Sequence, residues 1–438
     1  MAFMHQYEGS STPNGLGIRR LTILVLSLAV VIATQLVQAQ TYTVLHTFSG
    51  TDGGNPDAGL IRDPEGNVYG TTFYGGSSGK GVVFKLDPAG KETVLHSFTG
   101  GADGGYPQAG LIRDSEGNLY GTTTSGGLSG GACVGYLSAT CGVVFKLDPA
   151  GNETVLHSFA GFPTDGSNPA AALIRDSEGN LYGTTVQGGF TACLNICGVV
   201  FKLDPSGKET ILHSFTGGAD GAEPETGLIR DSEGNLYGTT NLGGDHGRIC
   251  RGFDGPPLGC GVVFRLDPSG KEKVLYNFAG LADGKGPSGL IRDSAGNLYG
   301  TTYAANGSAS GGGTVFELDP AGKITVLYGF PGGPPGDTPA AGVIRSSAGN
   351  LYGTTNNGGV FTGICSPNGC GVVFKLDTAA HETVLHTYSG GPDGASPHAG
   401  LIADSEGNLY GTTFGGGLTG IPSCLGNIGC GVVFKLKP

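Results

Sequence analysis

Basic residues are scarce in this chain, and those present are spread evenly along it. Lys and Arg number 24 against 36 Asp and Glu, which gives a formal net charge of −12 at pH 7. A protein that binds nucleic acid needs a basic face for the phosphates. The composition therefore argues against nucleic acid as a partner, and the absence of a basic cluster argues against attachment to a membrane surface.

Tryptophan is absent, and no segment after the first 40 residues shows helical periodicity. The chain has 86 glycines, and a glycine content this high can indicate disorder. Here, however, the glycines are interleaved with Val-Val-Phe and Leu-Ile runs, so they separate short strands. The sequence therefore predicts an ordered, all-β fold.

The first 40 residues differ in composition from the rest. Arg19 and Arg20 precede an apolar run from Leu21 to about Val37, and a small-residue cleavage pattern ends at Ala39. A charged segment, an apolar run and a small-residue site in this order are typical of a secretory signal. We predict that residues 1–39 form a signal peptide and are removed.

A retained N-terminal membrane anchor is the alternative, because the apolar run approaches the length of a membrane span. We favour cleavage, since repeat sequence begins at Thr41. No cysteine follows the apolar run to suggest a lipoprotein, and the end of the sequence, Gly431 to Pro438, reads as a strand with no apolar tail. We therefore expect no membrane span in the mature chain and a location outside the cell, in the periplasm or in the envelope.

One phrase, Asn-Leu-Tyr-Gly-Thr-Thr or a near copy, occurs seven times. Successive copies lie 51 to 62 residues apart and are centred on Tyr69, Tyr120, Tyr182, Tyr237, Tyr299, Tyr352 and Tyr410. Repeats of this length indicate a supersecondary unit that buries its apolar face against its neighbours. The repeat predicts that residues 40–438 form a single domain.

The second repeat reads as four strands joined by turns. Gly110–Arg113 is a short apolar strand, Asn118–Thr123 is rich in β-formers, and Gly142–Leu147 alternates Val, Phe and Leu on one face. Glu153–Phe159 is the fourth strand, after an Asp-Pro-Ala-Gly turn. Four antiparallel strands in each of many repeats are typical of a propeller blade.

The order of the strands predicts how the ring closes. A fourth-strand sequence at Thr43–Phe48 stands before the first repeat, and the seventh repeat ends after its third strand. The N-terminal strand must therefore supply the fourth strand of the last blade, which removes the exposed edges of an open array. We predict a seven-bladed β-propeller closed in this way, and we expect a monomer.

The ten cysteines fall in close pairs, each within one loop of its own repeat, and the first and fifth repeats have none. Cysteines that are present or absent together in an exported chain indicate local disulfides. A metal site would need convergent ligands, whereas these pairs are dispersed. We predict the disulfides Cys133–Cys141, Cys193–Cys197, Cys250–Cys260, Cys365–Cys370 and Cys424–Cys430.

The phrase Ile-Arg-Asp-Ser-Glu-Gly-Asn-Leu-Tyr-Gly-Thr-Thr, followed by Gly-Val-Val-Phe-Lys-Leu-Asp-Pro-Ala-Gly, resembles the GloVer-type tandem repeat of secreted bacterial proteins. The resemblance covers Thr41 to Pro438. It implies export and a repeat propeller, and it supplies no catalytic residues. The family often carries a variable C-terminal anchor, and none is visible here. The pattern is also similar to NHL-type propellers and to the streptogramin lyase propeller, a likeness of blades rather than of function.

The loop that enters each repeat carries Asp-Gly-x-x-Pro or a shortened form of it. Closure of the ring is expected to place these carboxylates in a circle near the mouth of the channel. The circle would be a rim for calcium or a polyol, or each Asp would only cap its own turn. The residues are Asp52, Asp103, Asp165, Asp220, Asp283, Asp337 and Asp393.

Two further side-chain rings repeat around the array. Arg62 and its counterparts would either hold an anionic ligand or pair with acidic residues of the adjoining turn. The fourth-strand His, such as His96, is replaced by Tyr276 and Tyr328 in two repeats, which favours a packing role over a metal or acid–base role. Tyr69 and its copies are likewise expected to pack, with the following glycine allowing close contact between blades.

Residues that occur once are better candidates for catalysis. The loop of the fourth repeat contains Asp245, His246 and Arg248, and His398 stands where other entry loops have Asp57, Gln108 or Glu225. A histidine beside carboxylates would act as an acid, a base or a ligand. A lone polar loop would otherwise be a solvated surface.

These patterns predict an exported, non-enzymatic propeller that binds a glycan or an extracellular protein on the face of its variable loops. No cofactor is expected apart from calcium. The alternatives are a propeller enzyme of the lyase or lactone-hydrolase type, acting through His246 or His398, and a structural protein of the cell envelope.

Overall fold

The computed structural model describes residues 40–127, 133, 140–189, 197–245, 250, 259–280, 282–305, 312–425 and 428–438. Thr41–Lys437 form one compact unit. In the described residues, no helix is long and apolar enough to cross a membrane. The predicted signal peptide, residues 1–39, lies outside the described residues and stays a prediction.

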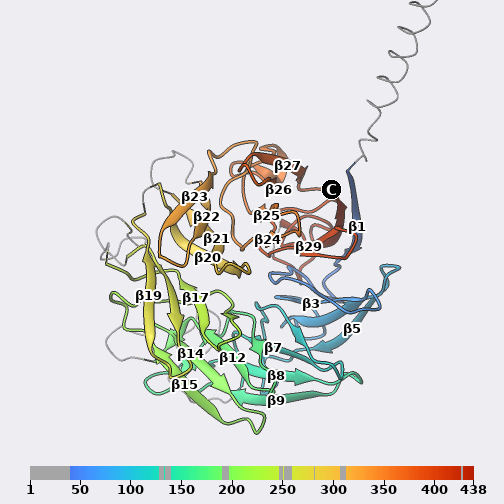
Figure 1. The fold of residues 1–438 in the computed structure, drawn as a ribbon. Helices are drawn as coiled ribbons and strands as arrows, with labels where there is room; N and C mark the ends of the chain where they lie inside the picture. The colour runs from blue at the N-terminus through green and yellow to red at the C-terminus, as the bar shows by residue number, and fades with distance from the viewer. Residues whose placement is uncertain are drawn as a thin grey trace, which may run out of the picture. The chain divides into compact units, whose positions relative to one another are not determined.

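Seven four-stranded antiparallel sheets form the blades of a β-propeller, as the repeat predicted (Figure 1). Blades 1 to 4 consist of β2 (Ile61–Arg62), β3 (Val68–Thr72), β4 (Val82–Leu86) and β5 (Glu92–Ser97); β6 (Ile112–Arg113), β7 (Leu119–Thr123), β8 (Val143–Leu147) and β9 (Glu153–Ser158); β11 (Ile174–Arg175), β12 (Leu181–Thr185), β14 (Val199–Leu203) and β15 (Glu209–Ser214); and β16 (Ile229–Arg230), β17 (Leu236–Thr240), β18 (Val262–Leu266) and β19 (Glu272–Asn277).

Blades 5 to 7 follow the same order. They consist of β20 (Lys285–Arg292), β21 (Leu298–Ala304), β22 (Thr314–Leu318) and β23 (Ile324–Gly329); β24 (Ile344–Arg345), β25 (Leu351–Thr355), β26 (Val372–Leu376) and β27 (Glu382–Thr387); and β28 (Ile402–Ala403), β29 (Leu409–Thr413), β30 (Val432–Lys437) and β1 (Thr41–Thr47). A short pair, β10 (Gly166–Ser167) and β13 (Gln187–Gly188), and a 3-10 helix, η2 (Gly363–Cys365), lie in the loops.

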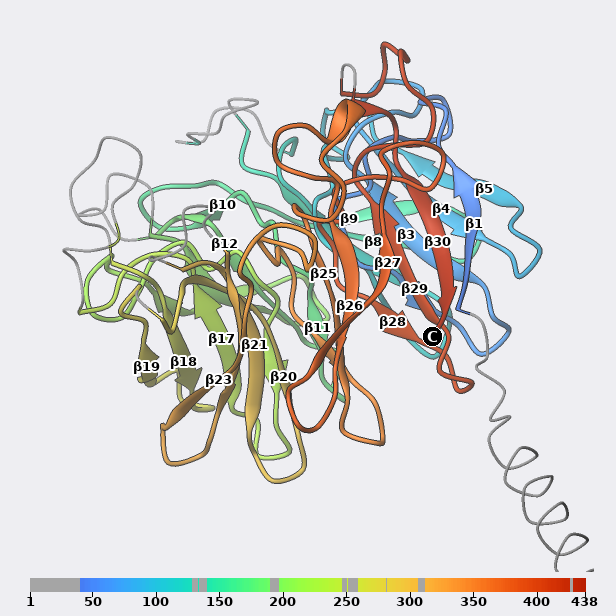
Figure 2. The same ribbon diagram turned by 90° about the horizontal axis from the view of Figure 1, so that it is seen from above.

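The ring closes where the first strand, β1, pairs with the last strand, β30, which confirms the predicted interlock. β1 pairs antiparallel with β30, from Thr41 opposite Lys437 to Thr47 opposite Val432 (Figure 2). Phe48, which follows β1, is fully buried in a cluster that joins blades 7 and 1. The first and last described segments are therefore parts of one sheet.

The hydrophobic core lies between blades, in seven clusters. Val82, Phe84 and Leu86 of β4 pack toward blade 7, whereas Val83, between them, packs toward blade 2. Because side chains alternate along a strand, one Val-Val-Phe-Lys-Leu segment buries apolar groups on both faces of its sheet. Each blade is thus stable only between two neighbours, as expected for a repeat protein.

The glycine of the second strand permits a close approach inside each blade. A Cβ added to Gly121 would lie 2.6 Å from Cζ of Phe145 and 2.9 Å from Cδ2 of Leu111. Phe145 belongs to the same blade, on β8. The glycine therefore makes room for an aromatic ring of its own blade, and the expectation of a close contact with the next blade was wrong in that respect.

Candidate functional site

A cavity of about 790 Å³ lies at one mouth of the central channel, and all seven blades contribute to its wall. The entry loops and the loops after each second strand meet there. Gly54, for example, forms a β-bridge with Tyr74 of the following loop. The entry loops and the loops between the second and third strands therefore lie together at this mouth.

Each entry loop is fixed by a residue in the left-handed region directly before the conserved proline. The φ angles are 50° to 61° at Asn55, Tyr106, Asn168, Glu223, Gly286, Thr338 and Ser396. At six of these positions the backbone N–H donates to a carbonyl two residues before the third strand of the preceding blade, as from Asn55 to Cys430 (2.7 Å) and from Ser396 to Cys370 (2.8 Å). Such backbone conformations cost energy in residues other than glycine and persist only where their surroundings hold them. The loop is therefore a rigid frame.

A collar of small residues joins the blades below this frame. In six of the seven blades a threonine hydroxyl of the second strand donates to a carbonyl of the next blade, as from Thr71 to Ala109 (3.1 Å) and from Thr354 to Ala399 (3.0 Å). The same hydrogen bond closes the ring from Thr412 to Ala58 (3.2 Å). The channel wall is thus a continuous structure rather than seven separate tips.

The residues that this frame carries differ from blade to blade. We call the following set the mouth residues. They are the side chains that follow the conserved proline, Asp57, Gln108, Ala170, Glu225, Ala340 and His398, and those that follow Gly-Thr-Thr, Phe73, Val186, Asn241, Tyr303, Asn356 and Phe414. The fifth entry loop is one residue shorter and contributes Ser288.

His398 and Asp57 are in side-chain contact across the junction of blades 7 and 1. Nδ1 of His398 lies 2.7 Å from Oδ1 of Asp57, and the ring stacks on Phe414 at 4.4 Å between centroids. Both side chains keep part of their surface open to the channel. With Nδ1 engaged by the carboxylate, Nε2 is the nitrogen left for a ligand.

Glu225 of blade 4 supplies a second acidic group to the mouth. Its side chain is exposed to the channel, yet the surrounding wall reduces its solvation. This enclosure, with the neighbouring Glu223 carboxylate, raises the pKa of Glu225 to about 7. Burial also raises the pKa of Glu223, and a hydrogen bond from Asn241 opposes that effect. The mouth therefore contains a carboxyl group that changes protonation near neutral pH.

The chemistry of the wall favours a polar ligand without negative charge. No lysine or arginine occurs among the described residues that line the cavity. Carboxylates, amides and one histidine offer hydrogen bonds, and the rings of Phe73, Tyr303 and Phe414 offer apolar surface. Tyr303 is 49% exposed, although a large ring usually packs away from water. A hydroxyl-rich ligand with apolar faces fits this combination.

The seven Asp residues of the entry loops lie elsewhere, so their expected position at the channel mouth was wrong. Oδ1 of Asp52 accepts hydrogen bonds from the backbone N (2.8 Å) and Oγ (2.9 Å) of Ser49, and Oδ2 lies 3.0 Å from Nε2 of His46 on the outer strand. Comparable contacts to the turn or to the outer His or Tyr occur at Asp103, Asp165, Asp220, Asp283 and Asp393, whereas Asp337 accepts from the hydroxyl of Thr338. These are the hydrogen bonds that the capping interpretation requires. None of the seven is among the described residues that line the cavity.

The other predicted residues are only partly described. Asp245 is exposed, and its N–H donates to Asn277 (3.2 Å), whereas His246 and Arg248 lie outside the described residues. Four predicted disulfides are present: Cys133–Cys141, Cys250–Cys260, Cys365–Cys370 and Cys424–Cys430. Cys193 lies outside the described residues, so the disulfide Cys193–Cys197 stays a prediction.

The repeated Arg and Tyr residues contact each other between blades on the opposite face. Arg62 lies over the ring of Tyr410 at 5.8 Å, and Arg345 lies over Tyr299 at 5.6 Å. The hydroxyl of six of the seven tyrosines donates to the Asp of its own turn, as from Tyr182 to Asp176 (3.0 Å). The turn before Tyr352 has Ser346 in place of that Asp. These residues pack the blades and do not line the mouth.

Two positions of the repeat vary strongly and carry the mouth residues, and a role was predicted from the sequence for only one of them. His398 drew attention because its position varies between repeats, and it is a mouth residue. The position after Gly-Thr-Thr varies as strongly, from Phe73 to Asn241 to Tyr303, and was missed. Variation at a fixed position in an otherwise constant repeat would have found both sets.

Comparisons with known proteins agree with this architecture. A family model described as the Gloeobacter/Verrucomicrobia repeat matches residues 30–250 and 253–438. Virginiamycin B lyase from Staphylococcus aureus is similar in structure, with a TM-score of 0.57 and 13% identity over 91% of this chain and 99% of that one. The extracellular domain of a protein described as a one-component system from B. thetaiotaomicron gives a TM-score of 0.53 and 11% identity, over 90% of this chain and 40% of that one. At these identities the likeness shows the fold alone, and no curated protein matches the chain.

Proposed function

The chain belongs to the Gloeobacter/Verrucomicrobia repeat family, and we propose that it is an exported binding propeller that takes a neutral saccharide at the channel mouth. Export is supported by the disulfides, which persist in oxidising compartments. The proposal concerns the mouth residues and leaves the seven Asp residues of the entry loops as turn caps.

One observation carries the proposal. The mouth residues are chemically different in almost every blade, whereas the frame beneath them repeats the same backbone angles and hydrogen bonds. Seven-fold repetition of a frame is what folding requires, but folding does not require Asp57, Gln108 and Glu225 to differ. A ligand that lacks seven-fold symmetry does require such differences.

The nature of the wall supports a saccharide over an anion. Phe73, Tyr303 and Phe414 provide faces for the apolar side of a sugar ring, and Gln108 and Asn241 provide amide groups for its hydroxyls. A phosphate or uronate would meet the carboxylates of Asp57 and Glu225 with no lysine or arginine among the described lining residues to balance its charge.

Thermal shift and calorimetry with the mature chain, residues 40–438, test the proposal against cello-, chito-, xylo- and manno-oligosaccharides. At 100 times its dissociation constant, a ligand adds about 2.7 kcal/mol to the free energy of unfolding. At least one neutral oligosaccharide should give a selective shift, and Tyr303→Ala should abolish it. Arg62→Ala, on the opposite face, is the matched control and should bind normally.

The proposal fails if every oligosaccharide leaves the melting temperature unchanged, or if Tyr303→Ala binds as well as the unmodified chain. Preferential binding of oligouronates would also contradict it, because the charge argument would then be wrong.

A second candidate function is catalysis on the same ligand. The motivating observation is the His398–Asp57 pair, in which a carboxylate orients the ring of an open imidazole, together with the Glu225 carboxyl and its pKa of about 7. Incubation of a bound oligosaccharide followed by mass spectrometry would detect cleavage or elimination. An unaltered oligosaccharide would leave binding as the function, whereas turnover that His398→Asn abolishes would establish the enzyme.

A further inference from the structure

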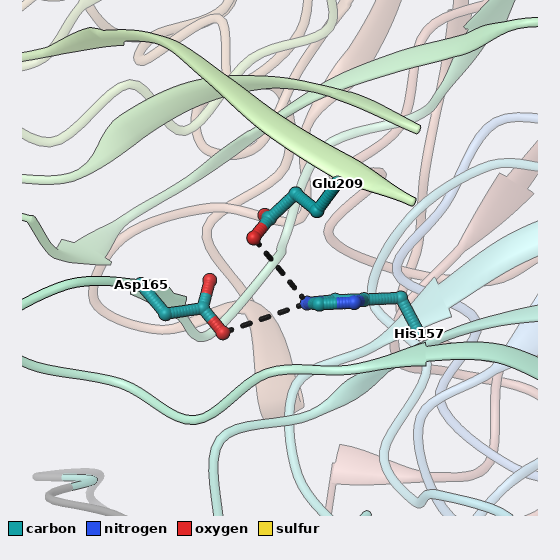
Figure 3. A group of neighbouring side chains, drawn as sticks. All are labelled: His157, Asp165 and Glu209. Carbon is teal, nitrogen blue, oxygen red and sulfur yellow. Dashed lines mark ion pairs between the residues drawn. The ribbon is translucent and has the colours of Figure 1, made fainter. Parts of the chain in front are cut away.

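A second cluster of titratable side chains lies at the outer rim, where blades 2 and 3 meet. His157 is on β9, Glu209 is on β15, and Asp165 is on the loop that connects the two blades. One ligand atom from each lies within 4.8 Å of the others, the only such group of three among the described residues. Figure 3 shows the edge of the His157 ring pointing between the two carboxyl groups.

The three groups are close without forming hydrogen bonds to one another. Nε2 of His157 lies 3.5 Å from Oδ2 of Asp165 and 3.6 Å from Oε2 of Glu209. Nε2 is buried and has no hydrogen-bond partner in the structure, and the same holds for Oε1 of Glu209. Two carboxyl groups that face each other away from water favour a proton or a cation between them. Accordingly, burial and the Asp165 charge raise the pKa of Glu209 to about 7.

Asp165 also differs from four of its counterparts at other junctions, although Asp283 resembles it in accepting from the N–H of an alanine. Asp52, Asp103, Asp220 and Asp393 each accept a hydrogen bond from the hydroxyl of a Ser or Thr at the start of the turn. Ala160 occupies that position here and donates only its backbone N–H to Oδ2 (2.7 Å), while Gly166 donates to Oδ1 (2.6 Å). These two bonds orient the carboxylate and leave lone pairs open toward His157 and Glu209.

The spacing fits a tetrahedral metal ion better than a set of hydrogen bonds. Zinc binds imidazole nitrogen and carboxylate oxygen at about 2.0–2.2 Å, so adjacent ligand atoms around it lie about 3.3–3.5 Å apart. The distances of 3.5 and 3.6 Å from Nε2 of His157 to the two carboxylate oxygens are close to that separation. An imidazole ligand argues against calcium, which takes oxygen ligands.

We propose that Nε2 of His157, Oδ2 of Asp165 and Oε2 of Glu209 bind one zinc ion, with water in the fourth position, and that the ion fastens blade 2 to blade 3. The site is independent of the channel mouth and of the proposed function. Binding requires neutral imidazole and ionised carboxylates, so it weakens as the pH falls and releases protons.

The chain itself supplies the matched variants for a test. At the junction of blades 4 and 5, Tyr276 replaces the histidine and donates to Asp283 (3.1 Å), and Ile324 replaces the glutamate. His157→Tyr and Glu209→Ile therefore introduce side chains that this fold already accepts at the equivalent positions. His213→Tyr is the same change at the junction of blades 3 and 4. There His213 pairs with Asp220 (3.5 Å), but the equivalent glutamate, Glu272, does not join them in a group of three close ligand atoms.

The experiment titrates zinc into chelator-treated mature chain against a chromophoric competitor, and records the visible spectrum with cobalt as a substitute ion. The unmodified chain and His213→Tyr should bind one equivalent, show the intense absorption of tetrahedral cobalt, and melt at a higher temperature with zinc. His157→Tyr and Glu209→Ile should bind at least about 100-fold more weakly, because each lacks one of three ligands.

The absence of stoichiometric binding by the unmodified chain would overturn the proposal. So would undiminished binding by a folded His157→Tyr variant, or an equal loss in His213→Tyr, since the ion would then lie elsewhere. If His157→Tyr does not fold, Glu209→Ile and the cobalt spectrum of the unmodified chain decide the question in the same way.

Discussion

The two faces of the ring are built from the same repeats. They differ in how far their side chains are the same from blade to blade. On one face, Asp114, Asn118 and Tyr120 form a hydrogen-bonded turn, and the same bonds recur in most other blades at 2.7–3.2 Å. On the other face, the frame recurs but the mouth residues do not. The residues that are the same in most blades stabilise each blade separately. The residues that differ between blades are not needed for this purpose and can bind a single ligand together. Perturbing either face should therefore give effects of different kinds.

The largest loss of stability is expected on removal of β1, because blade 7 lacks its outer strand without it. Deletion of Thr41–Phe48 removes the outer strand of blade 7 and the fully buried Phe48. Loss of a buried Phe side chain alone costs about 3–5 kcal/mol, and the deletion also opens the edge of β30. Calorimetry should show a melting temperature lowered by at least about 10 °C or no cooperative transition. An unchanged transition would contradict closure of the ring.

A substitution on the face of the repeated Asp–Asn–Tyr turns should lower stability without changing the affinity for the ligand. Asp176 accepts bonds from the N (2.9 Å) and Nδ2 (2.8 Å) of Asn180 and from the hydroxyl of Tyr182 (3.0 Å). Asp176→Ala should lower the free energy of unfolding by about 2–3 kcal/mol in denaturant titrations. Saccharide affinity should not change, and a loss of affinity would contradict the separation of the faces.

The same variant has a defined pH dependence. Although burial opposes ionisation, the hydrogen bonds from Asn180 and Tyr182 hold the pKa of Asp176 below its usual value. A carboxyl with a lowered pKa in the folded state stabilises the fold above its unfolded pKa of about 3.9, and that contribution disappears as the pH falls through the folded value. The difference between Asp176→Ala and the unmodified chain should therefore narrow below about pH 4.

A raised pKa at a junction between blades should make stability depend on pH in the opposite direction. Burial, with the nearby Asp103 charge, raises the pKa of Glu153 to about 7. The folded chain therefore keeps a proton on Glu153 that the unfolded chain loses above about pH 4.3, so its contribution to stability falls between that pH and 7. Glu153→Gln should raise the melting temperature by about 1–2 °C at pH 8 and leave it unchanged at pH 4. Glu65→Gln, in an exposed turn, is the control, and an equal rise in both variants would contradict the assignment.

The smallest effect on stability is expected at the mouth. Gln108 is exposed, so Gln108→Ala should alter the free energy of unfolding by less than about 0.5 kcal/mol. Loss of one hydrogen bond to the saccharide should nevertheless weaken its binding by about 5-fold to 10-fold, measured by calorimetry. A stability loss as large as that of Asp176→Ala would show that mouth residues also support the fold.

Most of the architecture was predictable because it is local and repeated. Four strand patterns in each repeat, the unpaired N-terminal strand and the paired cysteines each stand in the sequence as a complete signal. The bulge in each outer strand was not predictable. It shifts the register between Val83 and Phe84 and lets Leu95 pack in the core beside His96. Leu95 packs in the cluster between blades 1 and 2, and no single repeat contains both sides of that contact.

The residues of the candidate site were harder to predict from the sequence than the fold. The Asp-Gly pattern suggested a ring at the mouth, but the left-handed residue that follows it turns the chain, so the carboxylate stays beside the outer strand and the next side chains reach the channel. The sequence by itself determined the number of blades, their strand order and the closure of the ring, since periodicity and alternation are properties of short segments. Only the tertiary structure decided that His398 meets Asp57, 341 residues away, because closure of the ring brings blades 7 and 1 together. It also decided that Glu209 meets His157, because that contact depends on how the neighbouring blades 2 and 3 pack.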